Sequence, residues 1–167
     1  FTTLYSIPVT DENLKGWWTF EGVEDGIVTD QSGHGNIGMM MGDAQLVDVG
    51  GDTAVEFSGA GYVDLAASAW STIDTQASLA FWAYIDSATL PQANFIFGAF
   101  SDPAANDARV FSAHLPWSNG NIYFDASGPG YDRVSQAHTT EDVADAWIHW
   151  AFVKNADTGA QQIYRNG

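Results

Sequence analysis

Residues 146–167 read AWIHWAFVKNADTGAQQIYRNG and predict a β-hairpin. Aromatic and β-branched side chains fill residues 147–154, a turn-forming NADTG segment occupies residues 155–159, and a second short run covers residues 160–165. The final dipeptide, Asn166-Gly167, is the strongest short signal for a type I′ hairpin turn. Because such a turn joins two strands, we expect the fold to continue in strands that this sequence does not contain.

Alternate residues of the first run divide into two faces that are both apolar. Trp147 and His149 point to one face, whereas Trp150 and Phe152 point to the other. A strand of this kind is typical of the interior of a layered β structure rather than of an exposed edge. We therefore expect an open sheet edge to lie beside residues 160–165, where another chain could pair with it.

The rest of the chain has the pattern of an all-β protein. Short apolar runs recur roughly every 8 to 15 residues between clusters of Gly, Pro, Asn and Asp, which is the spacing of a sandwich or barrel. We expect a strand at residues 16–21, a helical turn at residues 141–146, and long loops at residues 101–108 and 127–145. The other expected strands are residues 44–49, 54–58, 62–65, 78–85, 94–100, 109–114 and 121–126.

The charge of the chain narrows the classes of partner. Its 167 residues are enough for one domain with a sizeable core, and they carry 21 acidic and five basic side chains, a formal net charge of −16. Such a surface repels nucleic acid and anionic lipid and favours divalent cations or neutral ligands, although ordinary solubility is an alternative explanation of the charge. The chain has no cysteine and no apolar run of membrane-spanning length, which excludes disulfides and thiolate metal sites and argues against membrane insertion.

A glycine-rich loop at residues 30–38, DQSGHGNIG, is the first candidate site. Ca²⁺ is bound by carboxylate, amide and backbone oxygens, and a glycine-rich bend turns carbonyl groups inward. The candidate metal ligands are Glu21, Asp30, Ser32 and Asn36. The alternative is that Asp30 and Ser32 stabilise a turn by hydrogen bonds from their side chains to the backbone.

The second candidate site is the segment of residues 109–133, which mixes aromatic and polar side chains. Aromatic faces stack on the C–H patches of sugars, while amide, carboxylate, imidazole and guanidinium groups bind hydroxyls. The candidate ligand-binding residues are His114, Trp117, Asn119, Asn121, Tyr123, Asp125, Tyr131, Asp132 and Arg133.

Alternation along residues 121–126 places Ile122 and Phe124 in the core and the intervening polar residues on the opposite face. The alternative to ligand binding is architectural. In that interpretation Trp117 and Tyr131 are packing residues, and Arg133 forms a structural salt bridge with Asp125 or Asp132.

The sequence lacks the usual signatures of catalysis. Retaining glycosidases need two carboxylates about 5 to 5.5 Å apart, and the E-x-D-x-x-E string that would supply them is absent, as is G-x-S-x-G. The four histidines are scattered without zinc-site spacing. We therefore expect a protein that is not an enzyme.

Five segments in order resemble a known family: GWWTFEG, DQSGHGNIG, AVEFSGAGYVDL, SLAFWAYID, and WIHWAFVKN with TGAQQIYRNG. Over residues 16–167 the chain resembles the laminin G-like domains of the concanavalin A-like lectin/glucanase superfamily. The resemblance implies a two-sheet antiparallel jellyroll sandwich in a secreted or cell-surface protein, often with bound carbohydrate and with Ca²⁺ near the segment matching DQSGHGNIG. Members of the family continue beyond the NG turn with several strands, and this sequence does not.

These observations predict an N-terminal arm or lead-in strand at residues 1–15 and a laminin G-like jellyroll domain at residues 16–167 that is incomplete at its C-terminus. The expected function is a non-catalytic, extracellular module of a larger secreted or cell-surface protein that binds carbohydrate or another surface ligand. The alternative is a structural surface, filament or adhesin subunit whose sheet is completed by another chain and which binds no small ligand.

Overall fold

The computed structural model describes residues 12–102, 109–126 and 132–167, and it divides the chain into two compact units, Phe1–Ile73 and Asp74–Gly167. Nearly all the regular structure is β, in antiparallel sheets, which confirms the predicted all-β class. No helix in the described ranges is both long enough and apolar enough to cross a membrane.

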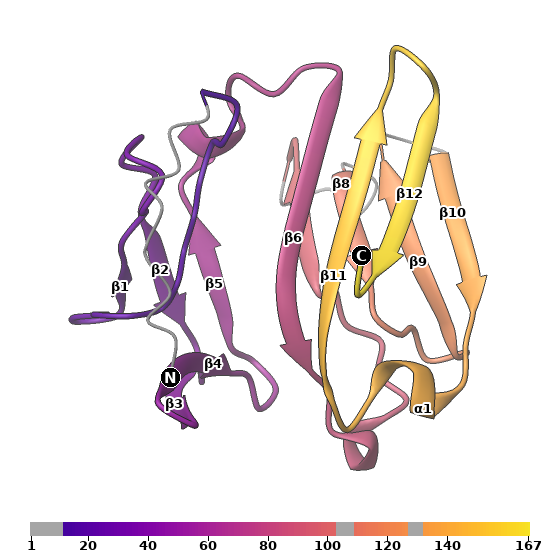
Figure 1. Cartoon of the computed structure of the whole chain (residues 1–167), viewed down its shortest axis with the longest axis horizontal. Helices are drawn as coiled ribbons and strands as arrows, with labels where there is room; N and C mark the ends of the chain where they lie inside the picture. The colour runs from indigo at the N-terminus through magenta and orange to yellow at the C-terminus, as the bar shows by residue number, and fades with distance from the viewer. Residues whose placement is uncertain (1–11, 103–108, 127–131) are drawn as a thin grey trace. The chain divides into compact units, whose positions relative to one another are not determined.

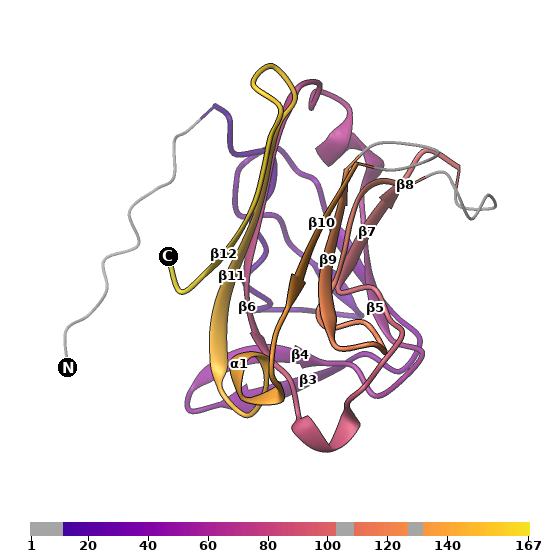
Figure 2. The same cartoon turned by 90° about the vertical axis from the view of Figure 1, so that its right-hand side faces the viewer.

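The second unit consists of two antiparallel sheets that lie face to face (Figures 1 and 2). The first sheet has the order β12-β11-β6 and the second has the order β10-β9-β8-β7. A short helix, α1, and a 3-10 turn, η2, lie in the connections. The bounds are β6 Gln76–Tyr84, η2 Ser87–Thr89, β7 Phe97–Phe100, β8 Arg109–His114, β9 Asn121–Ala126, β10 Asp132–Ala137, α1 Thr140–Val143, β11 Trp147–Asn155 and β12 Ala160–Arg165.

Phenylalanine rings fill the space between these two sheets. Phe152 of β11 is fully buried and stacks on Phe81 of β6 at 6.0 Å between ring centroids. From the opposite sheet, Phe97 and Phe124 meet the Phe152 ring edge-on at 5.1 and 5.4 Å. Burial of each such side chain is worth about 1.5–3 kcal/mol, and edge-to-face pairs add roughly 0.5–1.5 kcal/mol. This cluster fixes how the two sheets face each other.

The predicted hairpin is present, and its first strand is the central strand of its sheet. β11 pairs with β6 on one side and with β12 on the other. Ile148, Trp150 and Phe152 are buried, whereas on the other face, also expected to be interior, Trp147 is exposed and His149 is half-buried. Within the described part of the chain, β12 has β11 on one side and no strand on the other. The outer edge of β12 is therefore open there, as expected from the sequence.

The first unit contains a three-stranded sheet of order β1-β2-β5 and a separate two-stranded hairpin of β3 and β4. The side chain of Val28 is completely buried. Gly38 in β2 has no side chain, and a β-carbon at this position would lie within 3.4 Å of Leu65, Val63 and Val28. The bounds are β1 Ile27–Val28, β2 Gly38–Met41, β3 Gln45–Val49, β4 Asp52–Glu56, β5 Tyr62–Leu65 and the 3-10 turn η1 Ala67–Trp70.

Two expectations from the sequence were wrong. Residues 16–21 do not form a strand, because Phe20 has a positive φ of 63° and the backbone N–H of Trp17 donates to the Asp30 side chain instead of to a neighbouring strand. The expected long loop at residues 127–145 contains β10, whose sequence DRVSQA has a single apolar side chain larger than alanine, Val134, and so a weak strand signal. The expected loop at residues 101–108 lies mostly outside the described residues.

Candidate functional site

The carboxylate of Asp30 organises the glycine-rich loop of the first unit. Asp30 Oδ1 accepts hydrogen bonds from the backbone N–H groups of Trp17 (2.9 Å) and Ser32 (2.8 Å). Oδ2 accepts from the Ser32 hydroxyl (2.8 Å) and the Asn36 backbone N–H (2.9 Å). Burial raises the pKa of Asp30, but these hydrogen bonds outweigh it and hold the pKa below its ordinary value. This arrangement is the turn-stabilising alternative to metal binding that the sequence allowed.

The other candidate metal ligands also have protein partners. The Asn36 side chain donates to the Lys15 carbonyl (2.7 Å) and accepts from the Ser68 hydroxyl. The Glu21 carboxylate binds the backbone N–H and the hydroxyl of Thr53, at 2.8 and 2.9 Å. Among the described residues, no three His, Asp or Glu side chains are grouped so that they could hold a metal ion. The residues named from the sequence therefore do not fit a calcium site in this arrangement, and calcium binding stays a prediction.

In the second unit, most of the candidate ligand-binding residues lie together on one face of the β10-β9-β8-β7 sheet. Asp125 of β9 lies opposite Ser112 of β8 and Arg133 of β10, and Tyr123 lies opposite His114. Because residues directly opposite each other across antiparallel strands point to the same face, these side chains are neighbours. They share the face that is turned away from the phenylalanine core.

The charged centre of this face is Asp125, whose side chain is 0% exposed. Arg133 binds it bidentately, with Nε donating to Oδ1 and Nη2 donating to Oδ2 at 2.7 Å. The Arg109 guanidinium lies 3.6 Å from Oδ2 on the other side. Arg133 also lies over the Tyr123 ring, 4.3 Å from its centroid, which is a cation–π contact. One buried carboxylate thus holds two of the five basic side chains of the protein.

Two amides hold the phenol of Tyr123, one from Asn119 in the β8–β9 connection and one from Asn121 at the start of β9. Asn119 Nδ2 and Asn121 Nδ2 donate to the Tyr123 hydroxyl oxygen at 2.7 and 3.1 Å. The bond from Asn119, followed by that from Asn121, lowers the pKa of Tyr123. A tight turn positions these amides, because the Gly120 N–H donates to the Trp117 carbonyl and the Trp117 N–H donates to the Asn121 carbonyl, both at 2.8 Å.

His114 is buried between two aromatic rings. The Phe95 and Trp117 rings lie 4.3 and 4.5 Å from it, centroid to centroid. Its Nδ1 lies 2.9 Å from the Asn94 carbonyl, which can only accept, so Nδ1 carries the proton. Burial lowers the pKa of His114. The imidazole is therefore fixed on this face, and its burial favours the neutral form.

The structure thus brings together seven of the nine candidate residues. We call these seven side chains the β9 cluster: His114, Trp117, Asn119, Asn121, Tyr123, Asp125 and Arg133. Asp132 does not belong to it, because its carboxylate pairs with Lys154 of β11. Tyr131 lies outside the described residues.

Sequence reasoning missed two neighbours of the cluster, Arg109 and Phe95. Arg109 begins β8, and its pairing with Asp125 depends on strand register, which the sequence does not show. Phe95 lies in the connection before β7, and its position against His114 also depends on tertiary structure. The sequence contains one indication that Arg109 has a specific partner, because the chain has only five basic residues.

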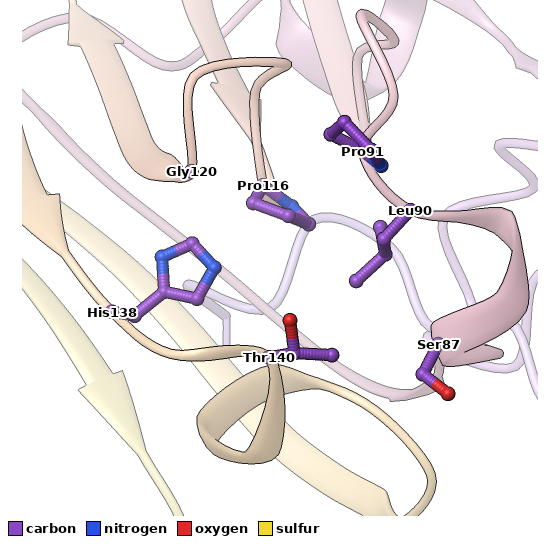
Figure 3. Close-up of a pocket in the computed structure, with 7 residues that line it drawn as sticks. All are labelled: Ser87, Leu90, Pro91, Pro116, Gly120, His138 and Thr140. Carbon is purple, nitrogen blue, oxygen red and sulfur yellow. The ribbon is translucent and has the colours of Figure 1, made fainter.

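A small pocket lies beside the β9 cluster at one end of the second unit (Figure 3). Its volume is about 150 Å³, and Figure 3 shows the His138 ring directed toward Pro116 and Thr140. The same β8–β9 connection that carries Trp117 and Asn119 contributes Pro116 and Gly120 to the pocket wall.

Comparison with known proteins gave one match. A family model, Laminin_G_3, described as the concanavalin A-like lectin/glucanases superfamily, matches residues 57–167. This range includes β5 and every strand of the second unit, and therefore all of the β9 cluster. No curated protein and no solved structure matches the chain.

Proposed function

The chain belongs to the concanavalin A-like lectin/glucanases superfamily, and from that premise we propose that it is a non-catalytic, extracellular module of a larger protein that binds carbohydrate through the β9 cluster. A neutral oligosaccharide, unlike an anionic one, is not repelled by the acidic chain. The proposed extracellular location rests on the family resemblance, and surface labelling of cells that express the protein tests it.

The observation that carries this proposal is the fixed juxtaposition of aromatic and polar groups on one sheet face. Trp117 and Tyr123 are half-buried, so each keeps part of its ring accessible while the rest is packed in place. Asn119 is exposed beside them. Side chains that are already ordered lose little entropy when a ligand binds, which favours affinity for a weakly binding class such as sugars.

The same geometry supports a binding role rather than hydrolysis. A glycosidase needs two carboxylates on either side of the scissile bond. Asp125 is the only carboxylate of the β9 cluster, and both of its oxygens are held by Arg133. With both oxygens bound and no second carboxylate in the cluster, Asp125 lacks the partner that glycoside hydrolysis needs.

A glycan array followed by calorimetry tests this function. We expect Trp117→Ala to abolish binding of the selected oligosaccharide with little change in Tm, because it removes the ring that would stack on the sugar. Trp17→Ala, which changes an exposed tryptophan of the first unit, is the matched control and should bind normally. Equal binding by the wild type and Trp117→Ala would reject the β9 cluster as the site, and parallel loss of binding and Tm would favour a packing role.

A second candidate function rests on the open edge of β12. Within the described residues this strand pairs only with β11, and unpaired strand edges recruit strands from other chains. In this alternative the protein is a structural surface, filament or adhesin subunit. Light scattering discriminates the two functions: a monomer that binds glycan supports the first, and an assembly indifferent to sugar supports the second.

A further inference from the structure

The β12-β11-β6 sheet carries exposed aromatic side chains on the face turned away from the core. Trp82 and Tyr84 of β6 are 63% and 50% exposed, Trp147 of β11 is 41% exposed and Tyr164 of β12 is 39% exposed. His149 of β11 lies among them, half-buried. We call these five side chains the β6–β11 aromatic face. It belongs to the opposite sheet of the sandwich from the β9 cluster.

The core of the sandwich does not require these rings. The alternate residues of the same strands, among them Phe81, Trp150 and Phe152, already fill the space between the sheets. Single exposed apolar residues are ordinary in proteins, whereas a contiguous group of large aromatic side chains marks an interaction surface. The group on this face therefore indicates a binding partner.

Cross-strand register gathers the rings into two pairs. Trp82 lies opposite His149, with ring centroids 5.3 Å apart, and Tyr84 lies opposite Trp147, with centroids 5.9 Å apart. The two pairs are two residues apart along the strands, a separation of about 7 Å. Their planes meet at 61° and 54°, so the rings do not form one flat plate. An uneven aromatic patch of this kind suits a single sugar chain better than a flat crystalline surface.

The charge of the protein indicates which class of ligand this face can bind. None of the side chains that β6, β11 and β12 place on it is Asp, Glu, Lys or Arg, although the chain as a whole carries a net charge of −16. An anionic polymer would be repelled by the surrounding protein. A second copy would bring two strongly acidic chains together. A neutral ligand with many hydroxyls meets neither obstacle, and it can use both the ring faces and the polar N–H and O–H groups of Trp, Tyr and His.

We propose that the β6–β11 aromatic face is a second carbohydrate-binding surface, which takes a single chain of a neutral polysaccharide. It acts independently of the β9 cluster and does not rest on that site being correct. Two separate surfaces on one module would raise the avidity for long chains, because the second binding event is intramolecular.

Affinity gel electrophoresis of the full chain tests this surface. Gels contain hydroxyethylcellulose, a soluble β-1,3-glucan or galactomannan as neutral polymers, or alginate as the anionic one. We expect at least one neutral polymer to retard the wild type and Trp82→Ala to raise its Kd at least tenfold, with a smaller loss for Tyr84→Ser. Trp17→Ala is the control for removal of an exposed indole, and it should be retarded like the wild type.

Comparison with Trp117→Ala separates this surface from the proposed function. Loss of polymer retardation in Trp82→Ala, with normal retardation in Trp117→Ala, supports the aromatic face even if the β9 cluster fails.

The proposal is overturned if Trp82→Ala runs like the wild type in every neutral gel, or if no neutral polymer retards the wild type. It is also overturned if Trp82→Ala converts a dimer to a monomer, because the occupant is then a second copy. Acrylamide quenching that is no greater in the wild type than in Trp82→Ala overturns it too, because another part of the chain then covers Trp82.

Discussion

Arg133 of β10 stands directly opposite Asp125 of β9 and holds both oxygens of its carboxylate with one guanidinium group. The carboxylate is completely buried and is paired with this guanidinium and with that of Arg109. A planar guanidinium can make both bonds at once, whereas a lysine ammonium is a point charge. The pair therefore supports the position of Tyr123 beneath Arg133 as well as the pairing of the two strands.

Removal of Arg133 should destabilise the protein and disturb the β9 cluster. We expect Arg133→Ala to lower the free energy of unfolding by about 1–3 kcal/mol, because it strips hydrogen bonds from a buried carboxylate. Arg133→Lys should recover only part of this loss, since it cannot bind bidentately. Urea unfolding measures both. A lysine variant as stable as the wild type would show that the bidentate geometry is unimportant.

The Asp30 hydrogen bonds give a second prediction. Asp30→Asn should lower the free energy of unfolding by about 1–3 kcal/mol. The amide nitrogen that replaces one carboxylate oxygen cannot accept the hydrogen bonds that this oxygen accepts, such as those from the Ser32 hydroxyl and the Asn36 backbone N–H. Asp48→Asn removes an equal charge from an exposed position of β3 and should have little effect. Equal losses in the two variants would contradict the turn-stabilising role.

The same pair of proteins also tests the calcium prediction. If the loop is only a turn, added Ca²⁺ should leave the Tm of the wild type unchanged. A calcium-dependent rise in Tm that Asp30→Asn abolishes would instead assign the loop to a metal site.

Gly42 and Gly50 allow a backbone prediction with a matched control. Both have left-handed φ angles, 65° and 69°, which cost a non-glycine residue about 1–2 kcal/mol. A β-carbon on Gly42 would lie 2.2 Å from the Ala60 carbonyl oxygen, whereas one on Gly50 meets nothing within 4 Å. We expect Gly42→Ala to be less stable than Gly50→Ala by about a further 1–3 kcal/mol in thermal unfolding. Equal stabilities would mean that the backbone near Ala60 can move aside.

The sequence predicted those parts of the fold that depend on local pattern. Alternation along residues 121–126 correctly placed Ile122 and Phe124 in the core, and the NADTG turn correctly joined the two strands of the β11–β12 hairpin. Asp125 also lies on the predicted face. It is nevertheless buried and paired with two arginines, and no pattern within one strand shows which residues from other strands lie over it.

Most of the β9 cluster could be predicted for the same reason. β8 and β9 form a hairpin, and β9 and β10 are consecutive neighbours in one sheet, so residues close in sequence stay close in space. Phe95 and Arg109 come into place through strand register and side-chain packing, which a single sequence does not specify. The β10 strand was missed because its alternation is polar on both faces except at Val134.

The buried imidazole of His114 predicts how stability depends on pH. Burial lowers the pKa of folded His114 below 6.5, whereas an unfolded histidine takes up a proton near that value. The unfolded state therefore binds more protons, so the free energy of unfolding should decrease as the pH falls through 6.5 toward the lower pKa of the folded state. Urea unfolding between about pH 7.5 and 5.5 measures this slope, in a window above the titration of the carboxylates.

His114→Gln should flatten that slope, because glutamine does not titrate and its amide can still donate to the Asn94 carbonyl. Burial also lowers the pKa of His138, so the slope that remains should disappear only when His138→Gln is added. A slope as steep in the double variant as in the wild type would show that neither imidazole is held neutral by the fold. In that case His114 would be free to carry a positive charge beside Asp125. The net charge of the β9 cluster would then change with pH near neutrality, and ligand binding by the cluster would change with it.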